Sequence, residues 1–348
     1  MKPIILLTDY LNRFESKHND FPYRSGMMHQ KLTEYFNYCG YNADFVSFSS
    51  IANSNLNFID IPVLYTSQED PGYYYKSFIE DIVHYVELKG GRLIPPYKYL
   101  KANNNKVFME LLRKELNLDS ENPLNAHCFG TLEEAMEKSD SFRYPIVVKG
   151  AEGAQGTTVK LARSKNSLKK IIKQVASSRN MKEEFRELVR SYKYSGYKKQ
   201  SNYRPKFSIQ QYLPPLKNDW KVYVFGDVIY VFYRPIFSHR GFRASGGGYD
   251  NYFYGEQAKV PDGLFNYAWG IAQKLSTPFV SLDIVMHESK FYLLEFQLVY
   301  FGTAGILKKY SKEYYKKTKD GWQIEPNQGD IEKVYTDSVV KYLERNSN

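Results

Sequence analysis

The chain has 348 residues, of which 43% are hydrophobic, so it holds enough apolar material for a packed core, and a largely disordered protein is excluded. A net charge of +10 is moderate for this length and fits a pocket for phosphate or carboxylate groups. The two cysteines, Cys39 and Cys128, lack the spacing of a zinc site or a disulfide framework. We expect both to be small buried hydrophobic residues. No apolar run approaches the roughly 20 residues that span a bilayer, and we expect a cytoplasmic protein without a transmembrane segment.

Strand and helix patterns alternate along the first 96 residues. Apolar residues at helical spacing occur at 32–39 and 75–86, between short apolar runs of strand length. The expected strands are 3–8, 43–48, 61–65 and 92–94. Because strands that alternate with helices are typical of parallel sheets, we predict a small parallel α/β domain over 1–96.

A second domain is expected over 97–210. Lys106 begins a helix, and the capping box that starts at Thr131 begins another. A basic stretch at 179–206 is helical at first and then poor in hydrophobic residues, which indicates an insert. The apolar side of the first helix consists of Val107, Phe108, Leu111 and Leu112, and the expected strands are 144–149, 158–162 and 207–213.

The third domain is expected over 211–348 and contains two hairpins. In the first, Gly226-Asp227 is a two-residue turn, and counting outward places Asp219 opposite Arg234, with Lys221 on the same face. One interpretation is a salt bridge on a solvated face, worth under about 1 kcal/mol. The alternative is a partly buried site, because the same face also carries aromatic residues, namely Tyr223, Tyr230 and Phe232.

The second hairpin, FVSLDIVMHESKFYLLEFQL at 279–298, carries three polar side chains that could bind a metal. If its loop has an odd number of residues, Asp283 lies directly opposite Glu295. Two opposed carboxylates destabilise a sheet, so this arrangement favours a hard cation between them, with Gln297 as a neutral oxygen ligand. A loop of even length would instead place Glu295 on the other face as an ordinary solvated charge.

Glycines follow the strand that ends at Lys149, in the run KGAEGAQGTT. Glycine loops allow backbone N–H groups to approach phosphate oxygens, and a lysine adds positive charge. The lysine precedes the glycines and no helix follows directly, so this is not a Walker A loop. A plain hairpin between two strands is the alternative.

In this order, the stretches resemble those of the ATP-grasp superfamily, largely carboxylate–amine ligases such as D-alanine–D-alanine ligase and the glutamate ligases of ribosomal protein S6. The resemblance covers roughly 97–310 and rests on two lysines, Lys106 and Lys149, and on five segments. These segments are IQQYLPP, NDWKVYVFGD, FRASGGG, SLDIVM and LLEFQ. The resemblance implies an ATP-grasp fold, in which the α/β domain at 1–96 precedes a two-part nucleotide-binding module. Lys221 stands where many members have arginine, and Gln297 replaces asparagine.

The resemblance also implies ATP and Mg²⁺ as cofactors and assigns roles to residues. Lys149 and Arg243 would stabilise the transferred phosphoryl group. Nucleotide contacts would come from Lys106, Lys149, Gly153, Gly156, Thr157, Gln211, Tyr212, Leu213 and Asp219. Substrate contacts would come from Lys221, Arg234, Ser245 and Gly246, and the metal ligands would be Asp283, Glu295 and Gln297.

The activity implied is ATP-dependent joining of a carboxylate to an amine through an acyl phosphate, with release of ADP and phosphate. A kinase on the same fold and a nucleotide-binding regulatory protein are the alternatives. We expect small-molecule acid and amine substrates of the amino-acid or sugar-derivative type, and a homodimer stays open. Basic residues are scattered outside 179–206, which argues against a nucleic-acid partner.

Overall fold

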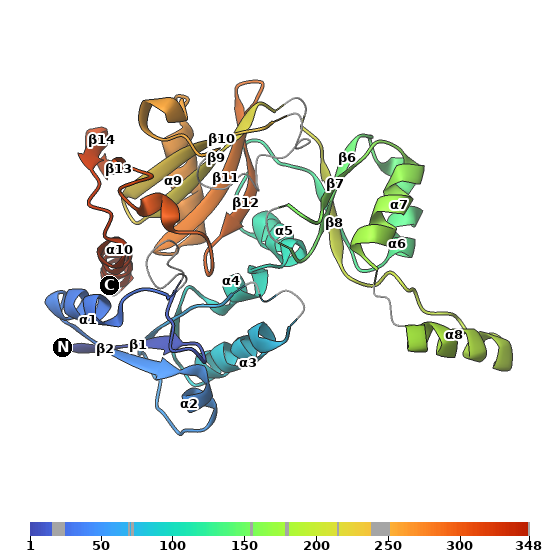
Figure 1. Ribbon diagram of the computed structural model, residues 1–348, viewed down its shortest axis with the longest axis horizontal. Coiled ribbons are helices and arrows are strands. Elements are labelled where there is room, and N and C mark those ends of the chain that lie inside the picture. The colour runs from blue at the N-terminus through green and yellow to red at the C-terminus, as the bar shows by residue number, and fades with distance from the viewer. Residues whose placement is uncertain are drawn as a thin grey trace. The chain divides into compact units, whose positions relative to one another are not determined.

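The structure is a computed structural model that describes residues 1–15, 25–68, 70, 73–153, 156–177, 181–213, 216–237 and 251–346 (Figure 1). The chain divides into two compact units. Unit 1 comprises Met1–Asn103, Leu116–Asn122 and Pro215–Asn348, and unit 2 comprises Asn104–Glu115 and Pro123–Pro214. The domain boundaries expected at residues 96 and 210 stay a prediction.

Unit 1 contains a parallel four-stranded sheet with the order β2-β1-β3-β4, as the alternating pattern predicted. Its inner strand β1 is an apolar run that is buried from Ile4 onward, and both of its edges are paired. The strands are β1 (Lys2–Thr8), β2 (Tyr41–Ser47), β3 (Pro62–Tyr65) and β4 (Arg92–Ile94). The helices of this part are α1 (His29–Tyr38), α2 (Phe48–Ala52), α3 (Tyr75–Leu88) and α4 (Tyr97–Ala102).

The second sheet of unit 1 has six strands in the order β12-β11-β9-β10-β13-β14, all paired antiparallel. The strands are β9 (Asn218–Phe225), β10 (Val228–Pro235), β11 (Phe279–His287), β12 (Lys290–Gln297), β13 (Glu313–Thr318) and β14 (Gly321–Pro326). The helices are α9 (Leu264–Leu275) and α10 (Ile331–Arg345). The sequence did not predict β13 and β14, because the Tyr- and Lys-rich β13 is half-exposed, β14 is half-exposed or exposed, and neither shows a clear apolar alternation.

One aromatic core joins the two sheets of unit 1. Tyr223, Phe225 and Phe279 of the larger sheet belong to the same buried cluster as Ile4 and Leu6 of β1. Helix α10 contributes Ile331, Tyr335, Val339 and Leu343 to this cluster. These aromatic side chains of the larger sheet are therefore part of the core of unit 1.

Unit 2 is built on an antiparallel four-stranded sheet with the order β5-β8-β6-β7. Ile146, Val148 and Ile209 on one face pack with Leu168 and Ile172 of the covering helix. The predicted capping box at Thr131 is present. The elements are α5 (Lys106–Glu115), β5 (Ala126–Phe129), α6 (Leu132–Glu137), β6 (Ile146–Gly150), β7 (Val159–Ala162), α7 (Lys165–Val175), α8 (Met181–Lys193) and β8 (Phe207–Gln211).

Two expectations about burial are wrong. Helix α5 exposes half of Leu111, whereas it buries Glu110 and Arg113, because these two charged side chains form an ion pair of 3.0 Å. Cys39 and Cys128 are free thiols but only half-buried. Among the described residues, no helix is long and apolar enough to cross a membrane.

Candidate active site

The hairpin of β11 and β12 places Asp283 directly opposite Glu295, as predicted. The route differs from the expected one, since the turn at Glu288-Ser289 has two residues, both with positive φ. A regular hairpin with that turn would pair Asp283 with Leu294. The register shifts by one residue between Asp283 and Ile284, so Leu294 is an extra, bulged residue and Glu295 takes its place.

In a regular strand Leu293, Glu295 and Gln297 would share one face, but the bulge turns Leu293 to the other face. This residue pairs with Ile284 and is fully buried, so it does not share the face of Glu295. Gln297 pairs with Ser281 and does share that face. The three predicted metal ligands, Asp283, Glu295 and Gln297, are therefore brought to one face of the sheet.

A buried cluster of charges adjoins these ligands. The predicted register of Asp219 opposite Arg234 is confirmed, and the interpretation of a solvated face is wrong because both side chains are buried. Arg234 donates to both carboxylate oxygens of Asp219, at 2.6 and 2.7 Å. Its Nη2 also lies 2.9 Å from Asp283 Oδ2, while Lys221 Nζ lies 2.9 Å from Asp283 Oδ1. Lys221 further donates to Gln297 Oε1 at 3.4 Å.

The two carboxylates of this cluster differ in their pKa values. Burial raises the pKa of Asp219 to about 6, against the opposing charge of Arg234. Burial also acts to raise the pKa of Asp283, but the charges of Arg234 and Lys221 outweigh it and lower that pKa to about 2. Asp283 is therefore ionised at neutral pH, as a metal ligand must be.

The donor atoms on this face fit a hard divalent cation. Mg²⁺ prefers carboxylate and amide oxygens and keeps further positions for water and phosphate. Ser281 Oγ is buried and has no hydrogen-bond partner in the described part of the chain, and Asp283 Oδ1 is buried beside Lys221 Nζ. The described residues contain no cluster of three or more His, Cys, Asp or Glu suited to a metal. The Asp283 and Glu295 carboxylates and the Gln297 amide are oxygen ligands of the kind that could hold Mg²⁺, provided that Lys221 and Arg234 give up their contacts with Asp283.

In unit 2, the start of α5 is tied to the glycine loop. Lys106 Nζ donates to the Gly153 carbonyl oxygen at 2.7 Å, and Gly153 N donates to Asn104 Oδ1 at 2.9 Å. Gly153 and Gly156 both have positive φ, and a Cβ on Gly153 would lie 2.9 Å from Thr158 Cγ2. The loop thus requires glycine at position 153 and holds it against Lys106, one of the predicted nucleotide contacts.

Lys149 lies on the sheet face opposite the α6–α7 core. It pairs with Ser208, and Gln210 lies on the same face through its pairing with Val147. Gln211 pairs with Ile146 and therefore lies on the other face, at the exposed end of β8. Tyr212 and the buried Leu213 follow directly. Gln210 therefore shares the face of Lys149, and Gln211 lies on the opposite face; the predicted contact of Gln211 with the nucleotide stays a prediction.

Sequence reasoning missed the polar residues behind Lys149. Gln210 Nε2 donates to Glu110 Oε1 at 3.2 Å, and Glu110 binds Arg113. The available signal was the pair of opposite charges three residues apart on α5, Glu110 and Arg113. Three predicted site residues, Arg243, Ser245 and Gly246, and part of the loop that carries them lie outside the described residues.

Unit 1 also contains a pocket of about 520 Å³ at the carboxyl ends of β1 and β3. Ligands bind at this edge in open α/β sheets. Tyr300, which closely follows Gln297, contributes to the wall. The charged residues of the lining are Asp9, Arg13, Glu15, Asp70 and Lys76, and the other tyrosines are Tyr10, Tyr73 and Tyr75.

Solved structures with the same arrangement define the class of the fold. D-cycloserine synthetase DcsG is 12% identical, with a TM-score of 0.56 over 98% of this chain and 99% of that one. D-alanine–D-alanine ligase from Bacillus anthracis is 11% identical, with a TM-score of 0.53 over 99% and 98% of the two chains. A RimK domain ATP-grasp protein from Sphaerobacter thermophilus DSM 20745 is 14% identical, with a TM-score of 0.51 over 97% and 99%. The chain has the ATP-grasp fold.

Sequence comparison identifies one related domain in part of the chain. Residues 102–193 match the family model of the RimK-like ATP-grasp domain. No curated protein sequence matches the chain. Residues 102–193 are therefore similar in sequence to the RimK-like ATP-grasp domain, and the whole chain shares the ATP-grasp fold of these structures.

Proposed function

We propose that the protein is an ATP-dependent ligase that joins a carboxylate to an amine through an acyl phosphate and releases ADP and phosphate. The observation that carries this proposal is the ATP-grasp fold with Asp283 held opposite Glu295 on adjoining strands. Two of the structural neighbours, D-alanine–D-alanine ligase and a RiPP-associated ATP-grasp ligase from Chryseobacterium gregarium, are ligases by name.

The reaction requires two displacements. A carboxylate oxygen attacks the γ-phosphorus of ATP, the bond to the ADP oxygen breaks, and an acyl phosphate forms. The amine nitrogen then attacks the acyl carbon, phosphate leaves, and the nitrogen loses a proton to give the amide. When bound, Mg²⁺ neutralises charge on the phosphate oxygens.

The residues described above would have separate roles in this reaction. Lys149 and Lys106 would bind phosphate oxygens, because lysine ammonium groups beside a glycine loop suit that task. Asp283, Glu295 and Gln297 would hold Mg²⁺. Arg234 and Lys221 are then released from Asp283 and become available to the anionic substrate, for which the planar guanidinium of Arg234 is well suited.

The pocket at the ends of β1 and β3 is the proposed site of the amine substrate. Arg13 is bound to Asp9 at 2.6 Å, and Lys76 pairs with Glu80, so each cation of the lining already has a carboxylate partner. The remaining acidic residues, Glu15 and Asp70, give the lining an excess of negative charge. Carboxylates and tyrosine rings together suit a protonated amine.

The test is a screen of acid and amine pairs for ATP-dependent phosphate release. A ligase releases free phosphate and forms an amide only when both substrates are present. Transfer of phosphate to an acceptor hydroxyl without amide would identify a kinase instead. Nucleotide binding without turnover for any pair would identify a regulatory protein.

A further inference from the structure

Helix α8, within the basic insert, presents an apolar stripe to solvent. Met181, Phe185, Leu188 and Tyr192 follow one another at spacings of four, three and four residues, so they lie on one side of the helix. Their exposed fractions are 83%, 68%, 58% and 96%. An exposed stripe of this kind marks an interaction surface rather than an ordinary polar face.

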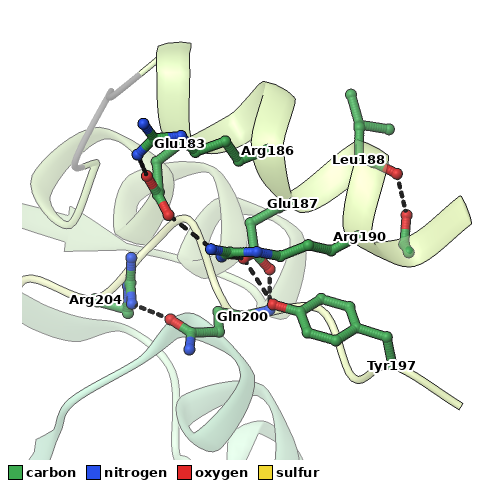
Figure 2. A network of polar contacts seen from close by, with 9 residues as sticks. Glu183, Arg186, Glu187, Leu188, Arg190, Tyr197, Gln200 and Arg204 are labelled. Carbon is green, nitrogen blue, oxygen red and sulfur yellow. Dashed lines mark hydrogen bonds and ion pairs between the residues drawn. The ribbon is translucent and has the colours of Figure 1, made fainter. Parts of the chain in front are cut away.

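The back of α8 is held by its own network of polar contacts, shown in Figure 2. The Glu187 carboxylate accepts from Tyr197 Oη at 2.7 Å, from Gln200 N at 3.0 Å and from Arg190 at 2.9 Å. Glu183 accepts from Arg186 at 3.0 Å. These contacts fix the helix to the segment that returns toward β8, so the orientation of the stripe is built into the insert.

The charges of the insert that carries the stripe are predominantly positive. Residues 181–206 contain eight lysines and arginines and three glutamates, a net charge of +5. The glutamates are buried or half-buried, and the basic residues are exposed. Among the described residues, four of these lysines have no carboxylate partner, namely Lys182, Lys193, Lys198 and Lys199.

Two partners could cover the apolar stripe, a second copy of α8 or a lipid surface, and the charge of the insert favours the lipid surface. A second copy of α8 would bring one +5 segment against another, and a stripe of four side chains is small beside the roughly 1,200–2,000 Å² of a stable interface. An anionic lipid surface needs no matching groove, attracts the lysines and accepts the apolar side chains. Tyr192 and the neighbouring Tyr194 are of the type enriched at the level of lipid headgroups.

We propose that α8 is a peripheral membrane-binding element that lies on anionic lipid bilayers, with Met181, Phe185, Leu188 and Tyr192 inserted among the headgroups. The lysines of the insert pair with lipid phosphates. The surface is separate from the residues assigned to the reaction, and its occupancy does not depend on which substrates the enzyme joins.

The test is co-sedimentation of the full-length protein with vesicles of phosphatidylcholine, with or without phosphatidylglycerol. The wild type binds the anionic vesicles, and raising the salt from about 0.1 M to about 0.5 M weakens the binding. Phe185→Ser combined with Leu188→Ser lowers the partition constant by more than about tenfold, and Lys198→Glu with Lys199→Glu does the same. Far-UV circular dichroism checks that each variant is folded.

Matched controls are available in the chain. Ile324→Ser removes an apolar side chain of similar exposure, 61%, from β14, and Lys169→Glu with Lys170→Glu reverses an adjacent exposed lysine pair on α7. Both controls keep wild-type binding. Equal affinity for neutral and anionic vesicles, or equal loss in controls and α8 variants, overturns the proposal. A wild-type dimer that Phe185→Ser with Leu188→Ser converts to a monomer assigns the stripe to a second copy instead.

Discussion

Arg234 donates two hydrogen bonds, of 2.6 and 2.7 Å, to the Asp219 carboxylate on the neighbouring strand of the larger sheet of unit 1. The same guanidinium reaches Asp283, two strands away, at 2.9 Å. Arg234 is therefore an ion-pair partner of two carboxylates. One is Asp219, its predicted cross-strand partner, and the other is Asp283, a predicted metal ligand.

We expect Arg234→Met to destabilise the protein strongly. Loss of the guanidinium leaves Asp219 buried without its partner, and breaking one half of a buried ion pair costs about 3–5 kcal/mol of unfolding free energy. The control is Lys316→Met, which removes a partly exposed pair with Glu325 in the same sheet and should cost less than about 1 kcal/mol. Urea denaturation measures both, and similar losses would contradict the central role of Arg234.

Asp283→Asn and Glu295→Gln should each lower Mg²⁺-dependent ADP formation by about a hundredfold or more, because charge neutralisation by the metal is worth several kcal/mol. Glu295→Gln should keep the wild-type melting temperature. Asp283→Asn should lower that temperature modestly, since Lys221 loses its charged partner.

The matched control is Glu288→Gln, which changes an exposed carboxylate at the turn of the same hairpin. Its rate should equal that of the wild type. Retained activity in both site variants would count against the metal assignment.

Lys149→Met and Lys106→Met should each weaken ATP binding by about 10- to 100-fold, as expected for losing a charge-assisted hydrogen bond worth about 1.5–3 kcal/mol. Lys106→Met also releases the Gly153 carbonyl and should increase hydrogen exchange in the glycine loop. Lys170→Met on α7 is the exposed control. Calorimetric titration with a non-hydrolysable ATP analogue distinguishes them, and unchanged affinity in both site variants would refute the nucleotide role.

The order of the basic insert should depend on pH through Glu187. The backbone N–H of Gln200 and the Tyr197 hydroxyl, together with Arg190, lower the pKa of Glu187 to about 2. Because the folded pKa is depressed, the stabilisation is present above the ordinary value of 4.5 and is lost as the pH falls through about 2. Hydrogen exchange at Gln200 N should therefore stay slow down to about pH 3.

Glu187→Gln should speed exchange at Gln200 N at neutral pH, because a neutral amide accepts these hydrogen bonds more weakly. Glu184→Gln, on the same helix, is the control and should leave that exchange unchanged. Equal protection in the two variants would show that the network does not hold the insert.

Local sequence patterns predicted the parallel sheet and the register of the first hairpin. The alternating pattern of the first 96 residues predicted the parallel sheet, and the glycine turn at Gly226-Asp227 placed Asp219 opposite Arg234. Both conclusions follow from neighbours along the chain, because a two-residue turn counts the register outward and a capping box is complete within four residues.

Tertiary structure decided the rest. The opposition of Asp283 and Glu295 depends on the bulge at Leu294, which compensates a turn of even length. The sharing of Arg234 depends on β9 lying between β10 and β11, which brings together residues about fifty positions apart. The burial of Glu110 and Arg113 depends on their pairing with each other and on Gln210 of a distant strand. A pattern of apolar residues records which side chains avoid water, but strand order and the partners of buried charges arise only when distant segments meet.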